Sequence, residues 1–157
     1  APGLISNNDI EHLTRIAEDA DAAKARILLH GAPDAALHEM IIVHTAGQYI
    51  RPHINHRSAK SFTVLQGEMS VALFNANGAI ITHYHLAEYR SGRAFMVRLE
   101  EPVFHTIVAR TPSVAFIETV LGPHQETRYA EFAPPANSSS SAAGYMGWLC
   151  AELGLDA

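Results

Sequence analysis

His53 and His105 are the two residues of this 157-residue chain whose surroundings most favour chemistry. His53 follows Tyr49 and Arg51 at steps of two in an extended segment, so the three side chains point to one face. His105 lies in a later apolar segment, and Glu118 lies in the segment after it. If these segments pair around a barrel, the two imidazoles and the carboxylate converge inside it. Histidine is the commonest metal ligand, so we expect a metal site there.

The neighbours of these histidines are candidates for a third ligand and for a binding pocket. Asn55 continues the face of His53, whereas strand alternation turns His56 outward unless a bulge re-aims it. Arg51 could hold an anionic substrate with two of its nitrogens, although a salt bridge at the rim is its commoner use. The expected metal ligands are His53, His105, His56 and Asn55. The expected pocket residues are Tyr49, Arg51, Lys60, Phe62 and Glu118.

The chain has ten histidines, and the others do not form a ligand pattern. His83 and His85 form a literal His-x-His, but no third ligand follows them, so an outward-facing strand is the better interpretation. We expect structural roles for His30, His38 and His44, and surface positions for His12 and His124.

The elements that must position these residues are mostly short strands. Residues 6–19 predict an amphipathic helix, because Ser6 and Asp9 stand in capping order and apolar residues follow at helical spacing. Between residues 26 and 121, runs rich in Val, Ile, Phe, Tyr and Thr alternate with turn signals, which predicts an all-β antiparallel barrel of the jelly-roll type. The expected strands are Arg26–His30, His38–Thr45, Tyr49–Asn55, Lys60–Leu65, Met69–Phe74, Ala79–Leu86, Ala94–Leu99, Val103–Ala109 and Val114–Val120.

The chain is expected to form one domain with a helical segment at each end. Residues 1–25 form the N-terminal helical segment and residues 26–122 the barrel. Residues 123–157 form an extension that packs on the barrel, with a surface linker around residues 131–141 and a closing helix over Ala142–Leu153. The apolar stripe of that helix is expected to cover a sheet or a second subunit.

Composition excludes several classes of partner. The net charge is −5 and no cluster of Lys and Arg exceeds two neighbours, so neither nucleic acid nor an anionic membrane is an expected partner. No stretch approaches the ~20 apolar residues that cross a bilayer, and no secretion signal opens the chain. The single cysteine, Cys150, fits a reducing compartment. We therefore expect a cytoplasmic protein.

Two sequence motifs resemble those of the cupin superfamily. The first runs from Gly47 through His53 to Gly67, with a Gly-x5-His opening and a Phe-x-Val-Leu-x-Gly continuation, and the second is Pro102-x-x-His105. Over roughly residues 26–135 the order of short strings resembles the WbuC-type cupin-fold metalloproteins of bacteria. These strings are Ala-Leu-His38-Glu-Met-Ile-Ile-Val, Tyr-Ile-Arg51-Pro-His53, Ser91-Gly-Arg-Ala-Phe, Val-Phe-His105-Thr, Glu118-Thr and Gly122-Pro.

This resemblance implies a cupin-type β-barrel (a double-stranded β-helix) that holds one divalent metal with histidines of both motifs and a glutamate of the first. It also implies a link to surface-polysaccharide metabolism. The chain departs from the pattern at two positions: Asn55 stands at the second histidine, with His56 displaced by one, and Lys60 stands at the glutamate. A lysine ammonium is not a ligand and repels a divalent cation nearby.

Three functions follow as expectations. The first is a metal-binding cupin that binds or transforms a small polar molecule, a sugar or carboxylate, with Fe, Mn, Ni or Zn in the barrel. As an enzyme it would be of the oxygenase or isomerase type, with Arg51 orienting the substrate and Glu118 moving a proton. The second is a metal-free ligand-binding or sensing cupin in which Lys60 and Glu118 replace the metal. The third is a metal-free epimerase-like cupin, for which no acid–base pair is evident. Edge strands and the closing helix predict a homodimer.

Overall fold

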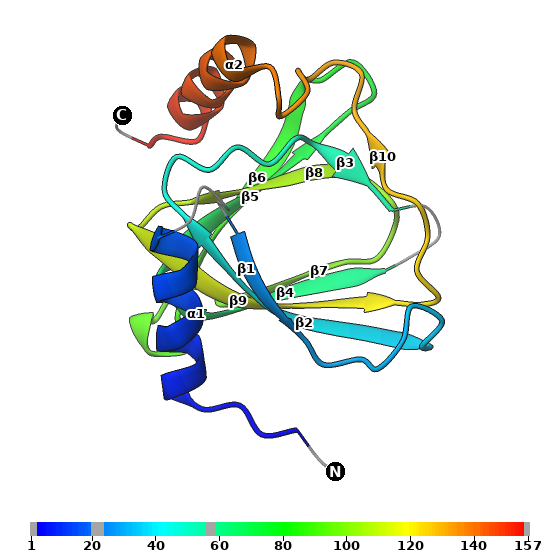
Figure 1. The fold of residues 1–157 in the computed structure, drawn as a ribbon. Helices are drawn as coiled ribbons and strands as arrows, with labels where there is room; N and C mark the ends of the chain where they lie inside the picture. The colour runs from blue at the N-terminus through cyan, green and yellow to red at the C-terminus, as the bar shows by residue number, and fades with distance from the viewer. Residues whose placement is uncertain (1–2, 20–23, 56–58, 156–157) are drawn as a thin grey trace.

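The structure, a computed structural model, describes residues 3–19, 24–55 and 59–155 of the chain. Two five-stranded antiparallel sheets face each other and enclose the interior, and one helix lies outside each sheet (Figure 1). This is the all-β antiparallel jelly-roll architecture that the sequence predicts. Neither helix combines the length and apolar character needed to span a membrane, within the part of the chain that the structure describes.

The first sheet has the strand order β1-β2-β9-β4-β7. Val43 of β2 pairs with Ala115 of β9, and Phe62 of β4 pairs with Glu118 of β9, so β9 lies at the centre. The strands of this sheet are β1 (Lys24–Leu28), β2 (Leu37–Thr45), β9 (Ser113–Leu121), β4 (Lys60–Gln66) and β7 (Met96–Leu99).

The second sheet has the order β10-β3-β8-β5-β6. His53 of β3 pairs directly with His105 of β8, which brings the two motif histidines into one row. The strands of this sheet are β10 (Arg128–Tyr129), β3 (His53–Ile54), β8 (Phe104–Ala109), β5 (Glu68–Phe74) and β6 (Ile80–Ala87).

The expected strands are present with shifted ends, one of them is much shorter than predicted, and one further strand was not predicted. The segment expected to be a strand over Tyr49–Asn55 keeps ladder pairing only at His53–Ile54, and β10 was not predicted. The two-residue β10 pairs with β3 from far along the chain, with Arg128 opposite Ile54. A strand of two residues has no alternation to detect.

The interior between the sheets is apolar over half of its length. Side chains from seven strands of the two sheets form this core, because alternate residues of each strand point inward. The buried members are Ile42, Phe62, Val64, Met69, Val71, Leu86, Leu99, Ile107, Val114 and Phe116.

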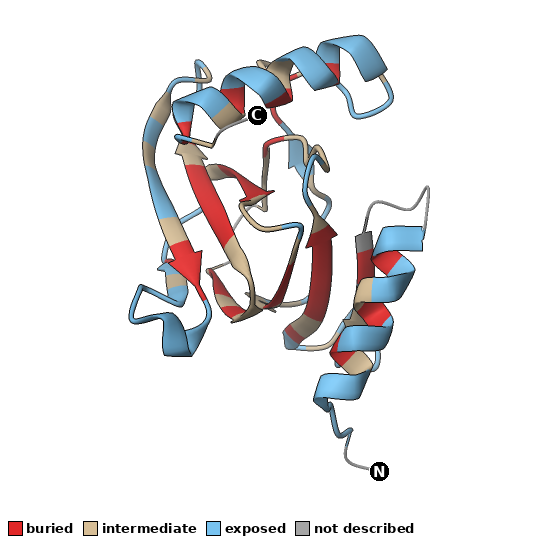
Figure 2. Ribbon diagram, turned by 90° about the vertical axis from the view of Figure 1, so that its left-hand side faces the viewer, coloured by how far each residue is buried: buried red, intermediate tan, exposed pale blue. Residues whose placement is uncertain are grey.

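The two helices cover the outer faces of the sheets (Figure 2). Helix α1 (Asn7–Asp19) packs Ile10, Leu13 and Ala17 on β1, β2 and β9. At its start the hydroxyl (2.6 Å) and the backbone N–H (2.7 Å) of Ser6 both donate to the Asp9 carboxylate, which confirms the predicted capping, and these bonds, the hydroxyl's first, lower the pKa of Asp9. Helix α2 (Ser139–Glu152) packs on the other sheet, with Met146, Leu149 and the following Leu153 against β5 and β8; the predicted stripe therefore covers a sheet. A short 3-10 helix, η1 (Tyr89–Ser91), precedes β7.

The glycine of the first motif, Gly67, joins β4 to β5. It adopts φ +77°, and a Cβ there would lie 2.5 Å from the Ser113 carbonyl oxygen and 2.6 Å from Thr111 Oγ1. A side chain at this position would therefore be strained and would push β9 away from β4. The motif glycine is needed for the two sheets to close at this end.

Candidate functional site

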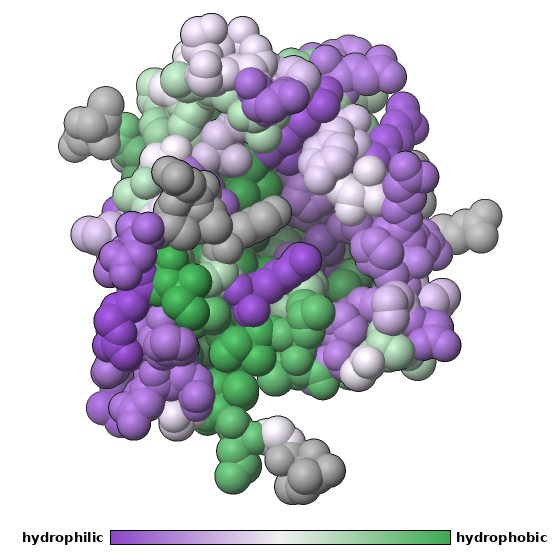
Figure 3. Space-filling model, in the orientation of Figure 1, coloured by the Kyte–Doolittle hydropathy of each residue, from purple (hydrophilic) through white to green (hydrophobic). Residues whose placement is uncertain are grey.

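The other half of the interior is an open cavity of 750 Å³, within the range of small-molecule sites. The face of the molecule seen in Figure 3 is hollowed between the sheets, and hydrophilic side chains lie in the hollow. The eight described site residues that the sequence predicts all line this space. They are Tyr49, Arg51, His53, Asn55, Lys60, Phe62, His105 and Glu118. His56 lies outside the described residues.

The two motif histidines lie side by side on the second sheet. Their ring centroids are 4.6 Å apart. The Nδ1–H of His105 donates to the Val103 carbonyl (2.8 Å) and that of His53 donates to the Arg51 carbonyl (3.0 Å). A carbonyl oxygen can only accept, so each bond fixes which ring nitrogen carries the proton. In His105 this leaves Nε2 as an acceptor.

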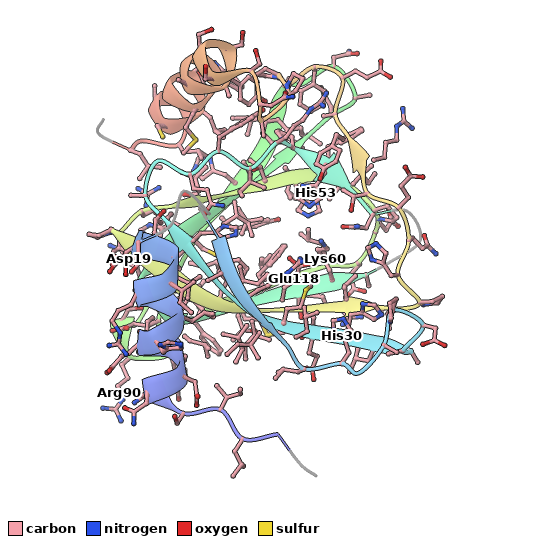
Figure 4. All side chains as sticks on the ribbon, viewed as in Figure 1. Asp19, His30, His53, Lys60, Arg90 and Glu118 are labelled. Carbon is pink, nitrogen blue, oxygen red and sulfur yellow. The ribbon has the colours of Figure 1, made fainter. Side chains whose placement is uncertain are left out.

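Lys60 donates a hydrogen bond to this nitrogen. Its Nζ donates to Nε2 of His105 at 3.3 Å and lies 3.3 Å from Oε1 of Glu118. Figure 4 shows Lys60 and Glu118 reaching from the first sheet into the interior toward His53 on the second. Lys60 is only 4 % exposed, so its charge needs this pairing. The ion pair weighed from the sequence as the alternative to a metal is therefore present.

The electrostatics of His105 follow from this contact. Its side chain is 3 % exposed. Burial lowers the pKa of His105 well below the usual value, and the charges of Lys60 and His53 lower it further. The His105 imidazole is therefore neutral at pH 7, and its Nε2 accepts the hydrogen bond from the Lys60 ammonium.

These residues do not fit a divalent cation. A lysine ammonium lies 3.3 Å from His105 Nε2, the nitrogen that would face an ion, and an ammonium has no lone pair to donate. No group of three His, Cys, Asp or Glu side chains within residues 3–19, 24–55 and 59–155 could share a metal. Lys60 also stands at the position where the resemblance predicts a glutamate ligand.

Arg51 and Tyr49 hold the cavity wall in place. Arg51 donates from Nε (3.1 Å) and Nη2 (2.7 Å) to the Ala130 carbonyl, and its guanidinium carbon lies 5.7 Å from the centre of the Tyr129 ring. The Tyr49 hydroxyl donates to the Pro134 carbonyl (2.9 Å). Burial raises the pKa of Tyr49 to about 12, so it stays a donor. Both side chains thus tie the segment after β9 to the barrel while one side of each faces the cavity.

Asn55 lines the cavity and has one polar atom without a partner. Its Nδ2 donates to Thr127 Oγ1 at 3.4 Å, but its buried Oδ1 has no partner among the described residues. A buried amide oxygen without a partner costs free energy, so Asn55 is a polar position that the fold does not fully satisfy.

Four histidines that sequence reasoning placed elsewhere also line the cavity: His30, His38, His44 and His124. His38 and His44 are buried, which agrees with the structural role predicted for them. His124 is exposed, which agrees with its predicted surface position. Sequence reasoning did not assign the inward-facing residues of β2. These are every second residue of the strand, His38, Met40, Ile42 and His44, and all four line the cavity. That alternation is the signal from which the cavity positions of His38 and His44 follow.

The cavity is basic in an acidic protein. The described residues that line it include three basic side chains, Arg26, Arg51 and Lys60, and six imidazoles, but one carboxylate, Glu118. The whole chain has a net charge of −5. Excess positive charge in a concave, partly desolvated site attracts anions.

The remaining His-x-His lies outside this site. His83 is exposed on β6, and His85 Nε2 lies 2.5 Å from Glu68 Oε2 on the outer face of the second sheet. The prediction of an outward-facing strand is confirmed.

Comparisons with solved structures identify the fold. CapF of Staphylococcus aureus, described as a capsular polysaccharide assembling protein, matches with a TM-score of 0.57 at 18 % identity over 72 % of this chain and 33 % of CapF. KdgF from Halomonas sp. matches with a TM-score of 0.51 at 20 % identity over 68 % of this chain and 86 % of that chain. The cupin domain of Schizosaccharomyces pombe Cnp3 gives 0.50 at 14 % identity, over 62 % of this chain and 64 % of that one.

These matches show a cupin fold and no more, because all three identities are low. The chain spans about one third of the length of CapF. A search of curated protein sequences gives no match, and the closer resemblance to WbuC-type cupins stays a prediction. The family model described as "Domain of unknown function (DUF6016)" matches residues 5–86, slightly more than half of the sequence, so the chain belongs to this family.

Proposed function

We propose that this protein is a metal-free cupin that binds a small anionic organic molecule inside the barrel, with the Lys60 ammonium in the place of a metal ion. One observation carries the proposal: Lys60 Nζ lies 3.3 Å from both Glu118 Oε1 and His105 Nε2. A fixed ammonium in a concave site is a point charge that a carboxylate or phosphate can approach. It attracts anions as a metal would, without open coordination positions.

The chemistry of the ligand follows from the wall of the cavity. Three cationic side chains face one carboxylate, which favours an anion. Asn55 and Thr127 also line the cavity, and their amide and hydroxyl groups can bond to hydroxyl groups of a ligand. A sugar acid or sugar phosphate has both features. CapF is described as assembling capsular polysaccharide, and this is consistent with a role in surface-polysaccharide metabolism.

A catalytic role within this proposal rests on Glu118. Its side chain is 15 % exposed and borders the cavity, so it can reach a bound molecule and exchange a proton with it. Arg51 acts on the ligand with the nitrogen that does not bind Ala130, and it is chiefly a positioning residue for the wall.

The test is metal analysis of protein purified without a histidine tag, followed by calorimetric titration with gluconate. We expect far less than one equivalent of Fe, Mn, Ni or Zn per chain, together with gluconate binding that Lys60→Met abolishes. Exposed Arg90 lies outside the cavity (Figure 4), so Arg90→Gln is the control that keeps binding. Retention of about one transition metal per chain would overturn the metal-free site.

The second candidate function is the metal-binding cupin. The paired rings of His53 and His105, each fixed through Nδ1 to a backbone carbonyl, favour it. The same metal analysis decides between the two candidates.

A homodimer in the cytoplasm completes the proposal. The first sheet ends in β1 and β7, which gives an edge strand for pairing with a second copy. Gel filtration with light scattering is expected to give twice the mass of the 17.1 kDa chain, and a monomer at micromolar concentration would remove this part.

A further inference from the structure

Tyr129 lines the cavity but is not among the site residues that the sequence predicts. It belongs to the two-residue strand β10, which lies beside β3 (Figure 1), and it pairs with His53. His53 in turn pairs with His105 on β8. Paired residues of neighbouring strands point to the same face, so the three rings form one row on the inner face of the second sheet. The row leads from the edge strand β10 to the Lys60 ammonium beside His105.

The exposure of this row decreases from Tyr129 to His105. Tyr129 is 54 % exposed, whereas His105 is buried. The aromatic rings of the apolar core, such as Phe62 and Phe116, are fully buried. A large ring that lines a cavity and stays more than half exposed offers apolar surface that a bound molecule can cover.

The backbone on both sides of Tyr129 is fixed. Ala130 is fully buried, and its N–H donates to the Pro52 carbonyl (2.8 Å). Its carbonyl accepts two hydrogen bonds from Arg51 (3.1 Å and 2.7 Å). On the other side of Tyr129, the ladder of β10 with β3 continues. The ring is therefore held in place before a ligand arrives, which reduces the entropy that binding costs.

One face of the Tyr129 ring is covered. The guanidinium carbon of Arg51 lies over the ring, 5.7 Å from its centre. The ring of His53 is 6.2 Å away between centroids and is inclined by 61°, so it meets Tyr129 in an edge contact. Within the part of the chain that the structure describes, these are the ring contacts of Tyr129. The face opposite Arg51 therefore accounts for the exposure of the ring.

The open face of Tyr129 looks toward a pair of polar side chains. Arg51 stands two residues before His53, and Asn55 stands two residues after it. Thr127 stands two residues before Tyr129, and its hydroxyl oxygen accepts a hydrogen bond from Asn55 Nδ2 (3.4 Å). Along the strands, Arg51 and the Asn55–Thr127 pair thus lie on opposite sides of the ring. Thr127 lines the cavity and uses only its oxygen in this bond, so its proton can be donated to a ligand.

We propose that the open face of Tyr129 is a stacking platform for the ring of a sugar acid in its closed, pyranose form. Such a ring carries C–H groups on its faces and hydroxyl groups around its rim. The faces can pack on an aromatic ring, and a hydroxyl group of the rim can bond to Thr127.

The spacing of the row allows one molecule to use both ends. Two strand spacings place the Tyr129 and His105 backbones roughly 10 Å apart. A pyranose that covers Tyr129 can therefore extend its carboxylate toward Lys60, which lies beside His105. This inference rests on the proposed function, since Lys60 binds the carboxylate, and it adds that the ligand is a ring rather than an open chain.

The test compares three probes by calorimetric titration. Methyl glucuronide carries a carboxylate on a pyranose ring that cannot open, gluconate carries the same charge on an open chain, and methyl glucoside has the ring without the charge. We expect methyl glucuronide to bind the wild type about tenfold more tightly than gluconate, as one aromatic stacking contact implies. Methyl glucoside should bind more weakly than either, because it lacks the carboxylate.

Substitutions of Tyr129 separate stacking from other causes of this preference. Tyr129→Leu keeps an apolar side chain but removes the flat ring, and we expect it to reduce the preference for methyl glucuronide over gluconate to within about threefold. Tyr129→Phe keeps the ring and should keep the preference. Tyr84→Leu, an exposed substitution on β6 that does not line the cavity, is the matched control and keeps the preference as well.

The outcomes distinguish the platform from the proposed function. A preference that survives Tyr129→Leu, that is lost in Tyr129→Phe, or that is missing in the wild type while gluconate binds, overturns the platform and leaves the proposed function standing. Methyl glucoside binding as tightly as methyl glucuronide would instead contradict the proposed function, because the carboxylate would then contribute nothing. If none of the probes binds the wild type, both are overturned.

Discussion

The two halves of the barrel interior are built by the same strands and differ in what fills them. On β4, Val64 lies in the apolar core, Phe62 lies in the core where it borders the cavity, and Lys60, on the same face two residues earlier, lies in the cavity wall. On β9, Phe116 lies in the core and Glu118 pairs with Lys60. Alternation therefore decides which side chains point inward, and position along the strand decides whether they pack or bind. Stability should depend on the first half and ligand binding on the second.

Removal of a core ring should show the largest effect. Phe116→Ala deletes a fully buried side chain that packs against Phe62 (ring centroids 6.1 Å apart). We expect a loss of about 4 kcal/mol in the free energy of unfolding, measured by urea denaturation. Ile81→Ala, 61 % exposed on β6, is the control and should cost little. Similar losses in the two variants would contradict the assignment of the core.

Breaking the ion pair should cost less, and unequally from its two sides. Glu118→Ala leaves the Lys60 ammonium buried without its counter-charge, and we expect a loss of about 3 kcal/mol. Lys60→Met leaves Glu118, whose 15 % exposure lets water reach the carboxylate, so the expected loss is about 1 kcal/mol. Urea denaturation of both variants and of the double variant measures this. The double variant should be more stable than Glu118→Ala alone; the reverse order would show that the pair is not the stabilising contact.

Lowering the pH should reduce the free energy of unfolding through His105. Because burial and the neighbouring charges lower the pKa of His105 in the folded state, the unfolded chain takes up a proton that the folded chain does not. The contribution is fully present above about pH 6.5 and is lost as the pH falls toward the folded value, by about 1.4 kcal/mol per pH unit. Unfolding free energies at pH 7, 6 and 5 should fall less steeply for His105→Gln than for the wild type. Parallel curves would mean that His105 titrates normally.

The smallest effect is expected at the cavity wall. Tyr49→Phe removes only the hydroxyl that donates to Pro134, and we expect a loss of about 1 kcal/mol. With a pKa of about 12 the hydroxyl stays protonated, so the loss should be the same at pH 6 and pH 9. A loss that changes between these two values in thermal unfolding would show that another group controls the contact.

Much of the fold could be predicted from the sequence because alternation is a local signal. The strand runs, both helices and the inward face of Tyr49, Arg51 and His53 follow from spacing alone. The sequence also shows Lys60 at the position where the resemblance predicts a glutamate. This substitution indicated an ion pair with Glu118, which the structure contains. Which of the two alternatives, metal or ion pair, the site favours required the 3.3 Å contact between Lys60 and His105.

The stacked rings of His30, His38 and His124 could not be predicted in the same way. His38 and His124 are 86 residues apart, and they meet only because β9 pairs with β2 and its following loop turns back over Pro33. The residues next to His38 and His124 in the sequence carry no pattern that predicts this pairing. The same is true of β10, whose pairing with β3 depends on tertiary contacts such as that of Arg51 with Ala130.

The central claim is that the ammonium of residue 60 takes the place of a metal, and a gain of metal binding tests it most directly. Lys60→Glu restores a carboxylate beside His53, His105 and Glu118, which should create a site for one divalent ion. Calorimetric titration with Mn²⁺ should show one equivalent bound by Lys60→Glu, none by the wild type, and none by the double variant Lys60→Glu/His53→Ala. If the wild type binds one Mn²⁺ as tightly as Lys60→Glu, the ammonium does not exclude the ion and the account is wrong.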